Sequence, residues 1–134
     1  MEGVDKVKLL IVDDSLFAQQ FVKKIVLNNL SGIQILLASS GQQAFEIYKD
    51  EHPDCIITDL LMPEMRGDEL IGLIREIDQT VKIIVHSADI QKAVKDEMLN
   101  YNVLGFINKP MNAEKSQLLI QLLEEGSDAQ LISK

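Results

Sequence analysis

The chain has 134 residues and a net charge of −8, with 13 basic against 21 acidic residues, and 46% of its residues are apolar. This length suits one domain with a single core. The acidic balance argues against a nucleic-acid partner, which requires clustered lysine and arginine. No apolar run approaches the length that spans a bilayer, and the acidic first residues do not resemble a secretory signal. We therefore expect no membrane partner. Because the single cysteine, Cys55, cannot form an internal disulfide, we expect a cytoplasmic protein.

Strand-like and helix-like segments alternate along the chain. An uninterrupted apolar run at 8–12 is typical of a strand buried on both faces. In chain order we expect strands at 8–12, 33–38, 55–59, 82–86 and 106–108. We expect helices at 15–28, 70–77, 90–101 and 113–125, and one more that starts within 39–41 and ends at 52. This alternation predicts an α/β fold: a doubly wound, five-stranded parallel sheet covered by five helices. We expect one domain over 1–134, with its core at about 7–125 and a frayed polar tail at 126–134.

Apolar spacing predicts which side of each helix faces the sheet. In the first helix, which Ser15 is expected to cap, the inward set is Phe17, Phe21, Val22, Ile25 and Val26. In the fourth helix the corresponding set is Ala93, Val94 and Leu99. The loop that opens at Met62-Pro63 is expected to make a tight bend at Gly67.

Polar groups follow four of the predicted strands at the point where each strand ends. Asp13 and Asp14 follow the first strand, Asp59 ends the third, and Ser87 and Lys109 follow the fourth and fifth. Ligands of open α/β sheets bind outside the carboxyl ends of the strands, so these groups are expected to meet at one edge. Clustered carboxylates repel one another unless cations compensate them, here Mg²⁺ and the lysine. The pattern therefore predicts a site that handles phosphate.

Each of these residues also has an ordinary structural explanation. The acidic pair and Asp59 could end strands and cap the next turn, Ser87 could cap a helix, and Lys109 could be a surface lysine. All four explanations would have to hold together at successive strand ends. We therefore reject them jointly and keep the phosphate interpretation.

Four short motifs in this order resemble a known family. They are VDDS at the first strand end, the D-x-x-M-P-x-M-x-G run from Asp59 to Gly67, the pair Ser87-Ala88, and Lys109-Pro110. Together they resemble the receiver domain of two-component response regulators, and closely the stand-alone, CheY-like chemotaxis members with their flavodoxin-like fold. The resemblance covers about residues 7–125.

The resemblance implies roles for the acidic residues and for one backbone group. Asp59 would be the phosphoacceptor in a Mg²⁺-dependent reaction. Asp14 would bind the metal directly and Asp13 mostly through water, and the backbone carbonyl of Leu61 would be a further metal ligand. Lys109 would pair with Asp59 before the reaction and with a phosphoryl oxygen afterwards.

The resemblance also implies a switch. Ser87 would donate a hydrogen bond to the phosphoryl group, and Phe106 would move inward, changing the face made by 90–101, 106–108 and 113–125. The bond between Lys109 and Pro110 would be cis. Leu61 and Asp89 would tune dephosphorylation.

The implied function is signalling rather than enzymatic turnover of a separate substrate, since the domain would promote only its own phosphorylation and dephosphorylation. Its partners would be a histidine kinase or phosphotransfer protein, a downstream protein target and, where one exists, a separate phosphatase. Two alternatives stay open: a receiver cut from a longer DNA-binding transcription regulator, and a phosphorelay or phosphate-sink receiver. A flavin-binding or dehalogenase-like phosphatase domain is disfavoured, because Asp13-Asp14-Ser15 offers neither phosphate-binding glycines nor a D-x-D motif.

Overall fold

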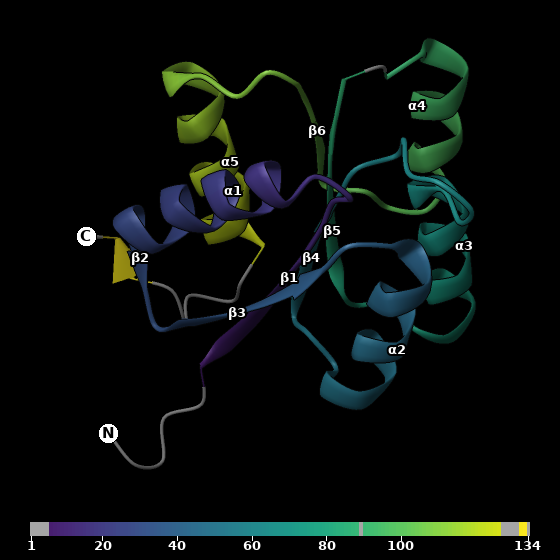
Figure 1. Ribbon diagram of the computed structural model, residues 1–134, viewed down its shortest axis with the longest axis horizontal. Helices are drawn as coiled ribbons and strands as arrows, with labels where there is room; N and C mark the ends of the chain where they lie inside the picture. Colours follow the sequence, from purple (N-terminus) through teal and green to yellow (C-terminus); the bar gives the residue numbers. More distant parts are fainter. Residues whose placement is uncertain (1–5, 89, 127–131, 134) are drawn as a thin grey trace.

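A parallel sheet with strand order β3–β1–β4–β5–β6 forms the centre of the protein (Figure 1). The computed structural model describes residues 6–88, 90–126 and 132–133. The strands are β1 (Val7–Val12), β2 (Leu30–Ser31), β3 (Ile33–Ala38), β4 (Cys55–Thr58), β5 (Lys82–Ser87), β6 (Gly105–Asn108) and β7 (Ile132–Ser133). The helices are α1 (Leu16–Asn29), α2 (Gly41–Glu51), α3 (Gly67–Ile77), α4 (Lys92–Leu99) and α5 (Ala113–Glu125). The predicted doubly wound, five-stranded architecture is confirmed.

Helices cover both faces of the sheet, so its strands are apolar on both sides. Alternate residues of each central strand belong to two separate cores. On one face Leu10 and Ile56 pack with α2, α3 and α4, and on the other Leu9 and Ile57 pack with α1 and α5. Figure 1 shows the same division of the helices. The carboxyl ends of all five parallel strands are thereby left at one edge, between the two helical layers.

A short antiparallel ladder lies outside the main sheet. β2 pairs with β7, matching Leu30 to Ser133 and Ser31 to Ile132. This ladder differs from the expected frayed tail, because two backbone positions of that segment have partners next to the end of α1. The remainder of the predicted tail, residues 127–131 and 134, lies outside the described residues.

Predictions about several individual residues are wrong. Of the predicted inward set of α1, Val22 and Val26 are buried, but Phe17 and Phe21 are 80% and 41% exposed. In α4 the buried side chain is Met98, whereas Ala93 is exposed and Leu99 is 52% exposed. Gly67 is the first residue of α3 rather than a bend, and a Cβ there would lie 1.9 Å from the backbone oxygen of Asp59. The glycine is needed for this close approach of two backbones.

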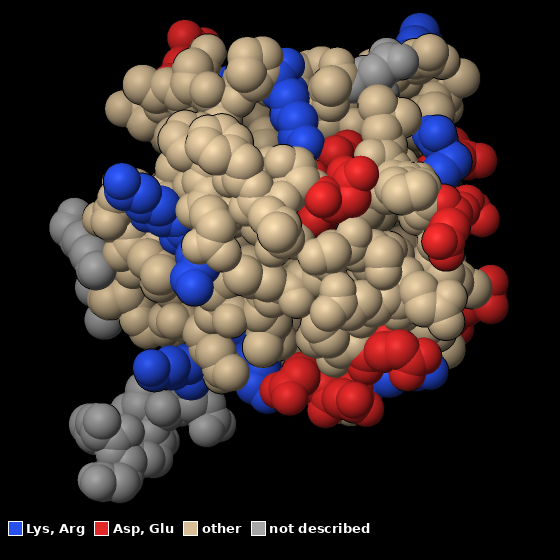
Figure 2. Space-filling view, in the orientation of Figure 1, with Lys and Arg blue, Asp and Glu red and all other residues tan. Residues whose placement is uncertain are grey.

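The surface carries more acidic than basic side chains. In the view of Figure 2, the carboxylates gather mainly over α2 and α3, whereas lysine and arginine are scattered. This face therefore lacks the clustered cations that bind nucleic acid. Within the described part of the chain, no helix is both long enough and apolar enough to cross a membrane.

Candidate functional site

The backbone carries the polar groups to one level at the carboxyl edge of the sheet. The N–H of Asp59, just beyond β4, donates to the carbonyl of Val12, the last residue of β1, at 3.0 Å. The N–H of Lys109, just beyond β6, donates to the carbonyl of Ser87, the last residue of β5, at 2.9 Å. Hydrogen bonding between neighbours thus continues one residue past the strands, and this aligns the side chains that follow.

Lys109 joins two carboxylates from different strands. Its Nζ lies 2.8 Å from Asp13 Oδ2 and 2.9 Å from Asp59 Oδ2. Asp13 and Asp59 are 3% and 5% exposed, so both carboxylates are held away from bulk water. Burial on its own would lower the pKa of Lys109, but its hydrogen bonds to both carboxylates raise that pKa. The ammonium therefore stays charged and compensates the buried acids.

The Asp59 carboxylate is bound on both of its oxygens. Oδ1 accepts from Ser87 Oγ at 2.6 Å and from the backbone N–H of Leu61 at 3.0 Å, and Oδ2 accepts from Lys109. Burial favours the neutral acid and would raise the pKa of Asp59. The hydrogen bonds from Ser87, Leu61 and Lys109 outweigh burial and hold the pKa below its ordinary value. The Asp59 carboxylate is therefore ionised at neutral pH.

Asp13, Asp14 and Asp59 form an acidic trio. One carboxylate oxygen from each lies within 4.8 Å of the others, and Asp14 is exposed whereas the other two are buried. Three hard oxygen donors close together, of which Asp14 is exposed to solvent, suit a divalent ion such as Mg²⁺ that retains some of its waters. The trio therefore fits the metal expected from the sequence, with Asp14 at the open side of the site.

The other predicted residues lie around this centre. Ser87 is fully buried, and the Lys109–Pro110 peptide bond is cis, as the resemblance implied. Phe106 on β6 is partly buried, with Lys95 Nζ 5.4 Å from the centre of its ring. Leu61 is 40% exposed next to Asp59. Asp89 lies outside the described residues, so its predicted role in dephosphorylation stays a prediction.

One buried residue of the site was missed by the sequence reasoning. Gln19 on α1 is 2% exposed, and its Nε2 lies 2.7 Å from the carbonyl oxygen of Asp13. A sequence signal existed, because Gln19 precedes Val22 by three positions and Val26 by seven. At helical spacing this puts a polar residue on the apolar, inward face of the helix.

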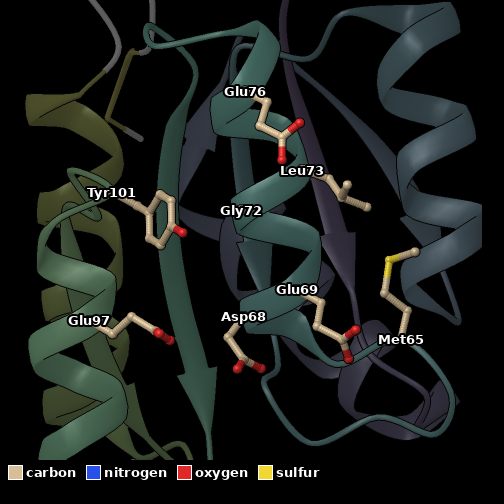
Figure 3. Close-up of a pocket in the computed structure, with 8 residues that line it drawn as sticks. All are labelled: Met65, Asp68, Glu69, Gly72, Leu73, Glu76, Glu97 and Tyr101. Carbon is tan, nitrogen blue, oxygen red and sulfur yellow. The ribbon is translucent and has the colours of Figure 1, made fainter.

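Surface hollows also lie outside the trio, and two of them border elements of the site. One, of about 390 Å³, runs between α3 and α4 and is lined by four carboxylates and Tyr101 (Figure 3). The other, of about 400 Å³, lies beside Lys109 and is lined by Phe17, Phe21 and His86, with other residues of α1 and the loop after β6.

Burial, followed by the charge of Lys109, lowers the pKa of His86, so its imidazole is neutral at pH 7.

Fold and site together define a doubly wound, flavodoxin-like α/β domain. Its site, at the carboxyl edge of the sheet, is acidic and contains a lysine that pairs with two of the carboxylates. The family model of the response regulator receiver domain matches residues 9–122. The chain belongs to the response regulator receiver domains. Receivers are signalling phosphoacceptors rather than classical enzymes, and the family generally binds Mg²⁺ at its acidic pocket.

Individual relatives agree with this assignment. The chemotaxis protein CheY of Bacillus subtilis (strain 168) is 35% identical over 109 residues, covering 81% of this chain and 89% of that protein. Sporulation initiation phosphotransferase F of the same organism is 31% identical over 111 residues, covering 81% and 86%. The crystal structure of a CheX–CheY–BeF₃–Mg²⁺ complex from Borrelia burgdorferi matches with a TM-score of 0.78 and 28% identity, over 88% of this chain and 87% of that chain.

Proposed function

We propose that this chain is a stand-alone, CheY-like response regulator. It accepts a phosphoryl group on Asp59 from a histidine kinase or a phosphotransfer protein, and then controls a protein partner in chemotaxis-like signalling. The observation that carries the proposal is the convergence of Ser87, Lys109 and the Leu61 amide on one buried, ionised carboxylate. The similarity to the chemotaxis protein CheY of Bacillus subtilis supports the chemotaxis-like part of the proposal. We expect it to act in the cytoplasm.

In the proposed reaction a carboxylate oxygen of Asp59 attacks the phosphorus of a phosphohistidine. A new O–P bond forms as the N–P bond breaks, and the electron pair of that bond leaves with the histidine nitrogen, which takes up a proton. The Lys109 ammonium exchanges its ion pair with the Asp59 carboxylate for one with a phosphoryl oxygen. The Ser87 hydroxyl donates a hydrogen bond to another phosphoryl oxygen. Because both donors already lie within 3 Å of Asp59, they need little rearrangement.

Asp13, Asp14, Asp59 and the carbonyl of Leu61 would hold Mg²⁺. When bound, this metal withdraws negative charge from the transferring group and offsets the repulsion among the carboxylates. The buried Asp13 and Asp59 supply fixed charge at the site, and the exposed Asp14 supplies the ligand that faces solvent.

Phosphorylation would alter the face made by α4, β6 and α5. The new group adds close to two negative charges beside Ser87 and draws its hydroxyl toward a phosphoryl oxygen. Phe106 then fills the space behind Ser87, and Lys95, which lies over its ring, moves with it. The downstream partner would bind this altered face, by a shift between two existing conformations. Leu61, which is apolar and cannot orient a water, and Asp89 would set the lifetime of the phosphorylated state.

Intact mass after incubation with Mg²⁺ and acetyl phosphate tests the acceptor. We expect a phosphate-sized gain in the native protein and in Asp50→Asn, which removes an exposed aspartate of α2, and none in Asp59→Asn. A gain retained by Asp59→Asn would refute the assignment. No gain in a folded native protein that binds Mg²⁺ would point to a receiver that signals by constitutive contacts.

The similarity to sporulation initiation phosphotransferase F favours a second candidate, a phosphorelay intermediate. The two functions differ in where the phosphoryl group goes next. A phosphorelay receiver would pass radiolabelled phosphate to a histidine of a second protein, whereas a chemotaxis-like regulator would lose it to water as inorganic phosphate. A receiver from a longer DNA-binding regulator would be recognised from a basic helix-turn-helix segment encoded downstream.

A further inference from the structure

The side chain of Gln19 is a buried amide that links the ends of two strands. Its Nε2 donates to the carbonyl of Asp13 at 2.7 Å and to that of Ala38, the last residue of β3, at 3.0 Å. The hydroxyl oxygen of Ser39 lies 3.1 Å from the same nitrogen. An amide nitrogen has two hydrogens, so the two carbonyls receive its shortest bonds. Burying this amide would be costly without such partners.

The bond to Asp13 acts on the acidic pair. The Asp13 carbonyl belongs to the peptide unit that joins Asp13 to Asp14, so holding it fixes the plane from which Asp14 projects. The N–H of Asp13 donates to Ala38 at 3.0 Å, and its Oδ1 accepts from the N–H of Ser15 at 2.9 Å. Asp13 is therefore held on both backbone sides and at its carboxylate. The exposed Asp14 takes its position from this fixed peptide unit.

The Gln19 amide nitrogen contacts two backbone carbonyls and the Ser39 hydroxyl, and within the described residues it does not bond to a carboxylate of the trio. Any effect of Gln19 on the site therefore passes through the Asp13 backbone. We infer that Gln19 is a positioning residue, which sets the affinity of the acidic trio for Mg²⁺ by holding the Asp13–Asp14 peptide unit. This inference rests on the proposed function, since it assumes that the trio binds Mg²⁺. Replacing a residue that hydrogen-bonds to a metal ligand and orients it typically lowers metal affinity by about 10–100-fold.

The test compares Gln19→Met, which keeps the length of the side chain but removes both N–H donors, with Gln20→Met. Gln20 is the exposed neighbour on the same helix and serves as the matched control. Calorimetric titration gives the dissociation constant for Mg²⁺, and intact mass gives the rate of phosphorylation by acetyl phosphate at increasing Mg²⁺. We expect Gln19→Met to weaken Mg²⁺ binding about tenfold. Its rate at saturating Mg²⁺ should return to that of the native protein, and Gln20→Met should match the native protein throughout.

The outcomes separate this inference from the proposed function. If the native protein binds no Mg²⁺, both are overturned. If the native protein binds Mg²⁺ and Gln19→Met binds it equally well, or loses a rate that saturating Mg²⁺ does not restore, the positioning role alone is overturned.

A measurement on the native protein decides the question if Gln19→Met does not fold. In its ¹⁵N-labelled form the side-chain NH₂ signal of Gln19 should exchange slowly with water and shift when Mg²⁺ saturates the site. The NH₂ signal of Gln20 should do neither. A Gln19 signal that Mg²⁺ leaves unchanged would overturn the inference.

Discussion

Replacing Lys109 by methionine removes the cation that compensates Asp13 and Asp59 while keeping an apolar side chain of similar reach. The ammonium makes two charge-assisted hydrogen bonds, at 2.8 and 2.9 Å. Each such bond contributes about 1.5–3 kcal/mol. Ordering a lysine side chain costs up to about 2 kcal/mol in rotamer entropy. Because the Lys109 side chain is 22% exposed, water screens part of the attraction, and we expect a net loss of about 2–3 kcal/mol in the free energy of unfolding.

Urea unfolding in EDTA, followed by circular dichroism, measures this loss. Lys115→Met is the matched control, since Lys115 Nζ makes a long, exposed contact of 3.4 Å to the carbonyl of Pro110, and we expect a change within about 0.5 kcal/mol. Saturating Mg²⁺ should narrow the gap between Lys109→Met and the native protein, because a bound divalent cation supplies the missing compensation. A loss below about 1 kcal/mol, or one equal to that of Lys115→Met, would refute the claim that the ammonium stabilises the buried acids.

Two further predictions concern the scaffold. Gly67→Ala would place a Cβ 1.9 Å from the Asp59 backbone oxygen and should lower the free energy of unfolding by about 3 kcal/mol or more. In the control Gly72→Ala the nearest atom to the new Cβ is 3.6 Å away, so we expect a gain of about 0.5–1 kcal/mol. Equal urea midpoints for the two variants would contradict the close-approach argument. Burial would raise the pKa of Asp78, but hydrogen bonds from Thr80, Tyr48 and Val81 lower it to about 2. The ionised carboxylate therefore contributes to the free energy of unfolding above about pH 4, and this contribution is lost as the pH falls from about 4 to about 2. Tyr48→Phe removes one of these donors and should raise the pKa of Asp78. Its urea midpoint should then fall less steeply than that of the native protein between about pH 4 and about pH 2. An unchanged pH dependence would exclude a contribution from the 2.7 Å bond that Tyr48 donates to Asp78.

The sequence was sufficient to predict the sheet and the groups at its edge, because each buried strand is an apolar run that stops at a charged or hydroxyl residue. Asp59, Ser87 and Lys109 meet as expected, since parallel neighbours in register bring their ends to one level. The pattern was less informative about helix faces. The spacing of Phe17 and Phe21 is helical, but which side of a helix is buried depends on what packs against it.

The errors have a common physical cause, which is contact between segments distant in the sequence. Gln19 is buried because its amide donates to the carbonyls of both Asp13 and Ala38, and these two carbonyls come together only once β1 and β3 lie side by side. Gly67 is required because the chain, after the loop at 60–66, returns to lie close against the backbone of Asp59. The two-residue strands β2 and β7 are too short to produce any alternating pattern that could be recognised.

The bonds of Lys109 span long stretches of chain, 96 residues to Asp13 and 50 to Asp59. During synthesis, Asp13, Asp59 and Ser87 leave the ribosome well before the lysine does. A nascent chain that ends before residue 109 therefore carries the Asp59 carboxylate without its cation, and cannot assemble the complete site. Under the proposed function, phosphorylation should begin only after β6 joins the edge of the sheet, so phosphorylation would indicate that the last parallel strand has been added.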